Sequence, residues 1–225
     1  MKNLNLKAFA GLLNLLVVLG LALFLPSWTL NYWQAWLFLA VFGVSVLAIT
    51  LYLMKNDPQL LERRVQAGPV AEQQTSQKII QGIAAIAFIA MIILPALDHR
   101  FGWSSVPTYW VIGGDILVAL GLYFVFLVFK ENSYTSAVIE VGAEQKIIST
   151  GPYAYVRHPM YIGALVMLLG VPPALGSWWG LLSIIPMALT ITMRLLDEEK
   201  FLLKNLPGYA DYQNKVKYRL LPFIW

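Results

Sequence analysis

Long apolar segments constrain this chain more than any other feature of its sequence. Four of them lie at roughly residues 8 to 25, 33 to 54, 79 to 97 and 108 to 129, and each is near the ~20 residues that span a bilayer as an α-helix. The chain is 59% hydrophobic and only 12% charged, whereas soluble domains carry roughly 25% charged residues. The sequence therefore predicts an all-α, polytopic membrane protein in which residues 1–129 form four spans.

A shorter apolar segment follows these four. Met160 to Val171 amounts to roughly 18 Å of helix and is followed by Pro172-Pro173, where a helix is expected to end. Gly176 to Met193 is apolar again. The two segments predict a shallow or tilted helical hairpin, which makes five to six membrane helices in all, and a short C-terminal tail. We expect a single membrane domain in which residues 130–225 form the functional core.

The cationic residues predict the orientation of these helices. If alternate connections lie on opposite sides of the membrane, fifteen of the sixteen Lys and Arg residues fall on one side and Arg100 falls on the other. The positive-inside rule makes the first side cytoplasmic. Both termini, the loop 130–159 and the tail are therefore expected in the cytoplasm, where the net charge of +4 would meet anionic lipid head groups rather than nucleic acid.

Several kinds of site are excluded or weakened by composition. The chain has no cysteine, so it can form no disulfide, thiolate nucleophile or Cys-ligated metal site. His99 and His158 are expected on opposite membrane faces and cannot share one metal ion, so we predict no metal. Asp115 lies inside the fourth span, where an acid is a functional candidate; the structural alternative is that it reaches interfacial water.

Two polar clusters border the predicted hairpin on its cytoplasmic side. The first is Thr150 to Gly163, TGPYAYVRHPMYIG, in which Pro159 suits the first turn of a helix. His158 then lies at a helix N-terminus, whose free N–H groups favour an anion. Arg157 would add a charge-assisted contact to that anion or would anchor on lipid phosphate.

The second cluster is RLLDEE, from Arg194 to Glu199. Arg194 and Glu198 are four residues apart on one helix face, so the structural interpretation is an intrahelical ion pair. The three adjacent acids exceed what Arg194 can neutralise, and surplus acid suits a cationic ligand. S-adenosylmethionine carries a carboxylate, an ammonium, a sulfonium and ribose hydroxyls, and its methyl group is already activated, so the protein need only align donor and acceptor and exclude water.

These clusters, with the ending PGYADYQNKVKYRLLPFIW, resemble the isoprenylcysteine carboxyl methyltransferase family and the related phospholipid methyltransferases. The resemblance covers roughly residues 130–225 and implies an integral membrane methyltransferase with a cytosolic cofactor pocket and a lateral opening to lipid. A chain this short is similar to the prokaryotic members, which implies an inner-membrane location. The N-terminal spans carry no motif that can be matched to the family.

The resemblance also implies which residues form the site. Arg194 and Glu198 are the predicted catalytic residues, and Arg194 would orient the carboxylate of an acceptor. Glu199, Tyr209, Tyr212 and Arg219 belong to the matching pattern without an assigned role. S-adenosylmethionine would be held by Glu198 and by residues of two nearby segments, namely Gln145, Lys146, Ile147, Ile148, Tyr153, His158, Pro159, Met160 and Tyr161.

The sequence is compatible with more than one methyl acceptor and more than one class of protein. The expected acceptor is lipophilic, and the carboxylate of an isoprenylcysteine-like thioether acid is favoured over a phospholipid amine or a small thiol. NADPH-dependent sterol reductases share the RHP-x-Y helix start and an ending similar to VKYRLLPFI, but the EE-x-x-L pattern at Glu198 to Leu202 resembles the methyltransferases and an acidic cluster suits NADPH poorly. A non-enzymatic membrane scaffold or transporter subunit is the least favoured interpretation.

Overall fold

A computed structural model describes residues 2–65, 71–72, 74–142 and 145–225. Within these ranges the secondary structure is entirely helical. Four long helices, α1 (Lys2–Ser27), α2 (Trp33–Asn56), α4 (Thr75–Phe101) and α5 (Thr108–Glu131), and the stretch Trp179–Asn205 are each long and apolar enough to cross a membrane. The predicted all-α membrane fold, with four N-terminal spans, is confirmed.

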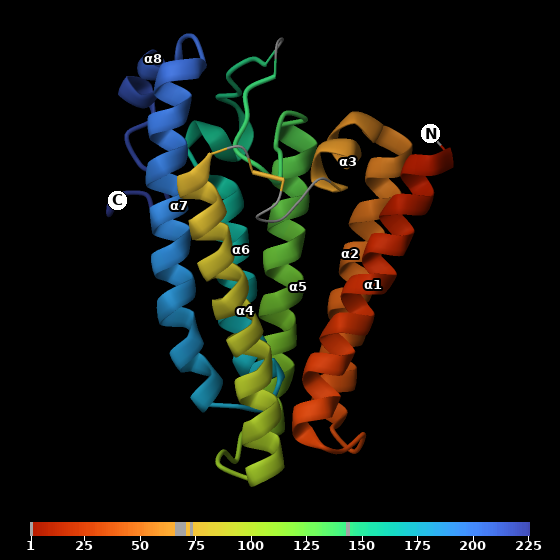
Figure 1. The fold of residues 1–225 in the computed structure, drawn as a ribbon. Coiled ribbons are helices and arrows are strands. Elements are labelled where there is room, and N and C mark those ends of the chain that lie inside the picture. Colours follow the sequence, from red (N-terminus) through yellow and green to blue (C-terminus); the bar gives the residue numbers. More distant parts are fainter. Residues whose placement is uncertain (1, 66–70, 73, 143–144) are drawn as a thin grey trace.

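The long helices run side by side and alternate in direction along the chain (Figure 1). Three short elements lie at the end of the bundle where the chain begins: α3 (Pro58–Val65), the 3-10 turn η1 (Gly151–Ala154) and α8 (Tyr209–Lys215). The connection that follows α4 and Arg100 lies at the opposite end. This arrangement agrees with the predicted segregation of cations, while the cytoplasmic assignment of the first end remains a prediction.

Glycines bring α5 very close to α6 (Pro159–Ala174). Gly114 and Gly121 on α5, and Gly163 and Gly170 on α6, are each seven residues apart, which places each pair on one helix face. A methyl group added at Gly163 would lie 2.9 Å from the carbonyl oxygen of Gly121, and one added at Gly170 would lie 2.8 Å from Cβ of Leu117. Only glycine lets the two backbones approach this closely, so α6 is held firmly against α5.

The end of α6 differs from the prediction. The helix was expected to end at Val171, but it continues through Pro172 and Pro173 to Ala174. Each proline lacks an N–H and so leaves the carbonyl four residues earlier without its usual helical hydrogen bond, although the fixed proline φ of roughly −65° is compatible with helical backbone. The carbonyl oxygens of both prolines accept hydrogen bonds, from Ser177 N at 3.0 Å and Gly176 N at 2.9 Å.

The second arm of the predicted hairpin also differs. It consists of the 3-10 turn η2 (Trp179–Ser183) and α7 (Ile184–Asn205), and together they are long enough to span a bilayer. The expectation of a shallow or tilted arm rather than an ordinary span is therefore wrong in length for this arm, because the helix continues beyond the apolar run through RLLDEE to Asn205. Only α6 remains short, at roughly 24 Å, and it is covered by its neighbours along much of its length.

Candidate active site

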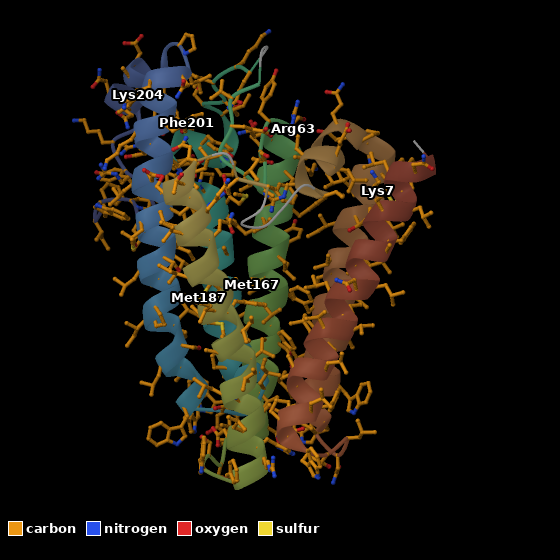
Figure 2. All side chains as sticks on the ribbon, viewed as in Figure 1. Lys7, Arg63, Met167, Met187, Phe201 and Lys204 are labelled. Carbon is orange, nitrogen blue, oxygen red and sulfur yellow. The ribbon has the colours of Figure 1, made fainter. Side chains whose placement is uncertain are left out.

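A cavity of about 330 Å³ opens at the end of the bundle that carries α3 and α8. Its volume lies at the lower end of the range for small-molecule sites, roughly 300–1,000 Å³. In Figure 2 nitrogen and oxygen atoms gather at this end, near Arg63 and Lys204, whereas the side chains around Met167 and Met187 are mostly carbon. The cavity is lined from α3, α4, the segments 132–140 and 145–148, η1, the start of α6, α7 and α8.

Most of the predicted site residues lie together in this cavity. Pro159 is the exception: it is the first residue of α6, is buried, and does not line the cavity. Arg194, the predicted acceptor residue, is part of the lining. The lining residues from the predicted cofactor set are Gln145, Lys146, Ile147, Ile148, Tyr153, His158, Met160, Tyr161 and Glu198.

The N-terminus of α6 is tied to the C-terminal tail. His158 is the residue that precedes the helix, as predicted, and its side chain is buried. The backbone N–H of His158 donates to the carbonyl of Arg219 at 3.0 Å, and that of Arg157 donates to the carbonyl of Tyr218 at 2.9 Å. The tail therefore fixes the backbone at the point where the cavity meets the start of α6.

Glu199 is the buried carboxylate that joins three segments at this point. It accepts hydrogen bonds from Nε of Arg157 at 2.6 Å and from Nε of Arg219 at 2.8 Å, and Nε2 of His158 lies 3.3 Å away. Nη1 of Arg157 also donates to the carbonyls of Val216 and Lys217, each at 2.8 Å. Because Arg157 is buried, the alternative that it anchors on lipid phosphate is wrong.

Glu198, one residue earlier on α7, turns toward the cavity instead. Its carboxylate accepts a hydrogen bond from the hydroxyl of Tyr161 at 2.7 Å. The expected ion pair between Glu198 and Arg194 is absent from the residues that the structure describes. That structural interpretation was wrong because Arg194 finds a partner outside its own helix.

Arg194 is bound by groups from the segment before α4, from the start of α4 and from the segment after α5. Its Nη1 donates to Glu72 Oε1 at 2.7 Å and to Gln77 Oε1 at 3.0 Å, and its Nη2 donates to the carbonyl of Ala137 at 3.0 Å. The Arg194 side chain is 15% exposed and that of Glu72 only 1%. A buried carboxylate thus neutralises the charge of Arg194 and fixes the guanidinium in one orientation.

Sequence reasoning missed Glu72 as a residue of the site. Besides Arg194, its carboxylate accepts from Gln81 Nε2 and from the backbone N–H of Ile139, both at 3.1 Å. The segment AEQQTSQ, which leads into the first turn of α4, contains an acid and several amides, which was the available signal. Nothing in that spacing indicated that the acid would contact a residue more than a hundred positions away.

The two neighbouring arginines of α3, Arg63 and Arg64, take different positions. Arg64 lines the cavity: its Nη1 donates to the carbonyl of Ser136 at 2.8 Å and lies 3.8 Å from Sδ of Met160. Its guanidinium carbon lies 5.0 Å from the centre of the Phe129 ring, and burial lowers the pKa of Arg64 to about 10. Arg63 does not line the cavity and donates to the carbonyl of Ser133.

Tyrosines form the wall of the cavity near α8. The hydroxyl of Tyr212 donates to the carbonyl of Tyr153 at 2.8 Å. Burial raises the pKa of Tyr212 to about 12, so the phenol keeps its proton and remains a donor. Tyr209 has a buried hydroxyl that finds no partner among the described residues, and burial raises its pKa as well. This hydroxyl is available to a ligand.

Two candidates lie away from the cavity. Asp115 is 4% exposed, and both its carboxylate oxygens are buried without a hydrogen-bond partner among the described residues. The structural alternative, that it reaches interfacial water, is therefore wrong. His99 stacks on Tyr32 with 4.0 Å between ring centres at the end of α4 that points away from the cavity. The described residues contain no group of three His, Cys, Asp or Glu side chains that could hold a metal.

The comparisons concern the part of the chain that builds this cavity. Residues 109–207 match the phospholipid methyltransferase family. The match includes α5, α6 and α7 and confirms the resemblance predicted from the two polar clusters. It supports a membrane methyltransferase and does not distinguish between acceptors.

A curated relative aligns over a similar length of chain. It is the cobalt-zinc-cadmium resistance protein CzcN of Cupriavidus metallidurans (strain ATCC 43123 / DSM 2839 / NBRC 102507 / CH34), which is 27% identical over 120 residues. The aligned residues make up 51% of this chain and 53% of the relative. The chain therefore spans about half the length of the curated relative that it matches.

Proposed function

We propose that this protein is an S-adenosylmethionine-dependent methyltransferase of the membrane that acts on a lipophilic acceptor. The observation that carries the proposal is the position of the Glu198 carboxylate. It is held by the Tyr161 hydroxyl at 2.7 Å inside a polar cavity at one end of an otherwise apolar bundle. An acid in that position can bind the ammonium group or the ribose hydroxyls of the donor.

The donor fits the remaining lining of the cavity. His158 and the start of α6 supply the positive end of a helix dipole for the donor carboxylate. The backbone of the segment 145–148 and the unpartnered hydroxyl of Tyr209 supply further hydrogen bonds. Tyr153 lies beside this segment in the same lining. The residues near α8 would thus surround S-adenosylmethionine.

The reaction is an in-line displacement at the methyl carbon of the sulfonium. A lone pair of the acceptor forms the new bond to carbon, the carbon–sulfur bond breaks, and its electron pair stays on sulfur to give S-adenosylhomocysteine. With a carboxylate acceptor the products are a neutral methyl ester and a neutral thioether, so no proton has to be moved. The chain would orient the two reactants and exclude water from them.

The favoured acceptor is the carboxylate of an isoprenylcysteine-like thioether acid. Arg194 lines the cavity, and Glu72 and Gln77 fix its guanidinium, so its orientation toward a carboxylate would be preorganised. A phospholipid amine is the second candidate, because the family that matches residues 109–207 is named for phospholipid methylation. An amine would have to lose a proton, and Glu198 is a carboxylate of the cavity lining that could receive it.

Isothermal titration of the detergent-solubilised protein with S-adenosylhomocysteine and with NADPH tests the donor. We expect S-adenosylhomocysteine to bind and NADPH not to bind. His158→Ala and Glu198→Gln should each weaken binding by about 10-fold or more, since a hydrogen bond to a charged group contributes about 1.5–3 kcal/mol. Asp197→Asn is the matched control, because Asp197 accepts hydrogen bonds from Ser76 and Gln77 and does not line the cavity.

Two results would refute this assignment of the donor site. One is binding of NADPH in place of S-adenosylhomocysteine, which would favour the sterol reductase alternative. The other is an equal affinity of Glu198→Gln and Asp197→Asn for S-adenosylhomocysteine.

A further inference from the structure

The three arginines of the cavity differ in whether a carboxylate neutralises them. Arg157 is paired with Glu199 at 2.6 Å and Arg194 with Glu72 at 2.7 Å. Arg64 lines the same cavity but forms no ion pair with any residue that the structure describes. A partly buried guanidinium without a counter-ion favours the binding of an anion.

Arg64 also keeps hydrogen-bond donors for such a ligand. A guanidinium has five N–H donors, and within the described part of the chain Arg64 bonds only through Nη1, to the carbonyl of Ser136 and the sulfur of Met160. Arg194, by contrast, uses both Nη atoms on protein groups. The donors of Arg64 that remain match the planar geometry of a carboxylate or a phosphate.

Arg64 lies between the polar cavity and an apolar cluster. Its helix, α3, buries Leu60 and Leu61 in an apolar cluster with Phe129 of α5, and Met160 packs against this cluster. Arg64 stands over the Phe129 ring, where the polar cavity meets that cluster. The wall proposed for the donor is a different cluster, built around Tyr209 and Tyr212 of α8.

We propose that Arg64 binds the anionic head group, a carboxylate or a phosphate, of the membrane amphiphile that accepts the methyl group. This assignment rests on the proposed methyltransferase function and adds a specificity-determining residue to it. In this arrangement Arg64 selects the charge of the head group, and Arg194, fixed by Glu72, keeps the orienting role proposed for it above.

Binding to the full chain in detergent, loaded with S-adenosylhomocysteine, tests the proposal with three probes that share one tail. They are N-acetyl-S-farnesylcysteine, farnesyl phosphate and farnesol. We expect the wild type to bind at least one of the two anionic probes about 10-fold or more tighter than farnesol, and Arg64→Gln to bring that ratio near unity. Arg64→Lys should recover part of the preference, because it keeps the charge and loses the planar guanidinium.

Arg63→Gln is the matched control, since it removes a neighbouring charge of the same helix outside the cavity lining. The anionic probe that the wild type binds more tightly shows the class of acceptor: N-acetyl-S-farnesylcysteine indicates a carboxylate and farnesyl phosphate indicates a phosphate. No preference in the wild type, or a preference that survives Arg64→Gln, would overturn the proposal. So would equal weakening by Arg63→Gln.

Separate titrations with S-adenosylhomocysteine distinguish this proposal from the proposed function. We expect Arg64→Gln to leave that affinity within about 2-fold of the wild type, which also reports that the variant is folded. If Arg64→Gln weakens S-adenosylhomocysteine as much as the anionic probes, the anion at Arg64 belongs to the donor and the proposal is overturned. If the wild type fails to bind S-adenosylhomocysteine, the proposed function fails, while the response of the probes to Arg64→Gln still decides the role of Arg64.

Discussion

Replacing Glu199 by glutamine should destabilise the protein far more than the same change at Glu198. The Glu199 carboxylate accepts charge-assisted hydrogen bonds from Arg157 at 2.6 Å and from Arg219 at 2.8 Å. An amide keeps one acceptor oxygen and turns an NH₂ group toward the other guanidinium. At least one of the two hydrogen bonds is therefore lost, and Arg157 and Arg219 are left without the carboxylate that neutralises them both.

The magnitude follows from burial. The side chains of Arg157 and Glu199 are 6% and 5% exposed, and breaking such a buried pair by removing one partner costs about 3–5 kcal/mol. Arg219 is 33% exposed, so solvent screens most of its share. For a chain of this size about 1 kcal/mol lowers the unfolding temperature by roughly 2–4 °C, which gives an expected loss of roughly 6–20 °C for Glu199→Gln.

Thermal unfolding in detergent measures this difference, and limited trypsin digestion at Lys215 and Lys217 reports release of the tail. Glu198→Gln is the matched control, because an amide oxygen can still accept from the Tyr161 hydroxyl, and we expect its unfolding temperature to stay close to the wild type. The reasoning would be refuted if the unfolding temperature of Glu199→Gln lay within about 2 °C of that control. A difference of about 2 °C corresponds to roughly 1 kcal/mol or less. Unchanged trypsin cleavage would refute the role assigned to the tail.

Two further predictions concern the membrane part of the bundle. Gly121→Ala should destabilise the protein by about 1–3 kcal/mol or more through overpacking, because the added methyl would collide with backbone atoms of Met167. Gly113→Ala is the control, since its added methyl meets nothing within 4 Å. Equal unfolding temperatures of the two variants would contradict the close approach of the helices. Asp115→Asn should leave S-adenosylhomocysteine affinity unchanged and should not lower the unfolding temperature, since it replaces a buried carboxylate without a described partner. Loss of donor binding in calorimetry would show instead that Asp115 acts on the site.

The sequence predicted those parts of the molecule that local chemistry determines. Apolar runs predicted the membrane helices, because burying backbone in lipid requires continuous helix. Pro159 predicted the start of α6, and α6 begins there. The cofactor residues were predicted from contiguous motifs, and the structure places nearly all of them in one cavity lining.

Long-range partners could not be predicted in this way. Arg194 was expected to pair with Glu198 four residues away, but an exposed pair of that kind contributes only about 0.2–0.5 kcal/mol. Such a small preference is easily outweighed by the buried carboxylate of Glu72, with further bonds from Gln77 and Ala137. For the same reason Arg64 could not be assigned to the cavity: its contacts are with Ser136 and Met160, far along the chain.

The two adjacent glutamates of α7 explain how one helix serves several parts of the site. Successive residues of an α-helix are rotated by roughly 100°, so Glu198 and Glu199 cannot face the same partner. Glu198 meets Tyr161 of α6 in the cavity, and Glu199 meets Arg157 before α6. One turn earlier, Arg194 contacts the segment before α4 through Glu72. Because each contact has a separate direction, changes at Glu198 should affect ligand binding while changes at Glu199 affect stability, and the contrast between the two variants tests this division.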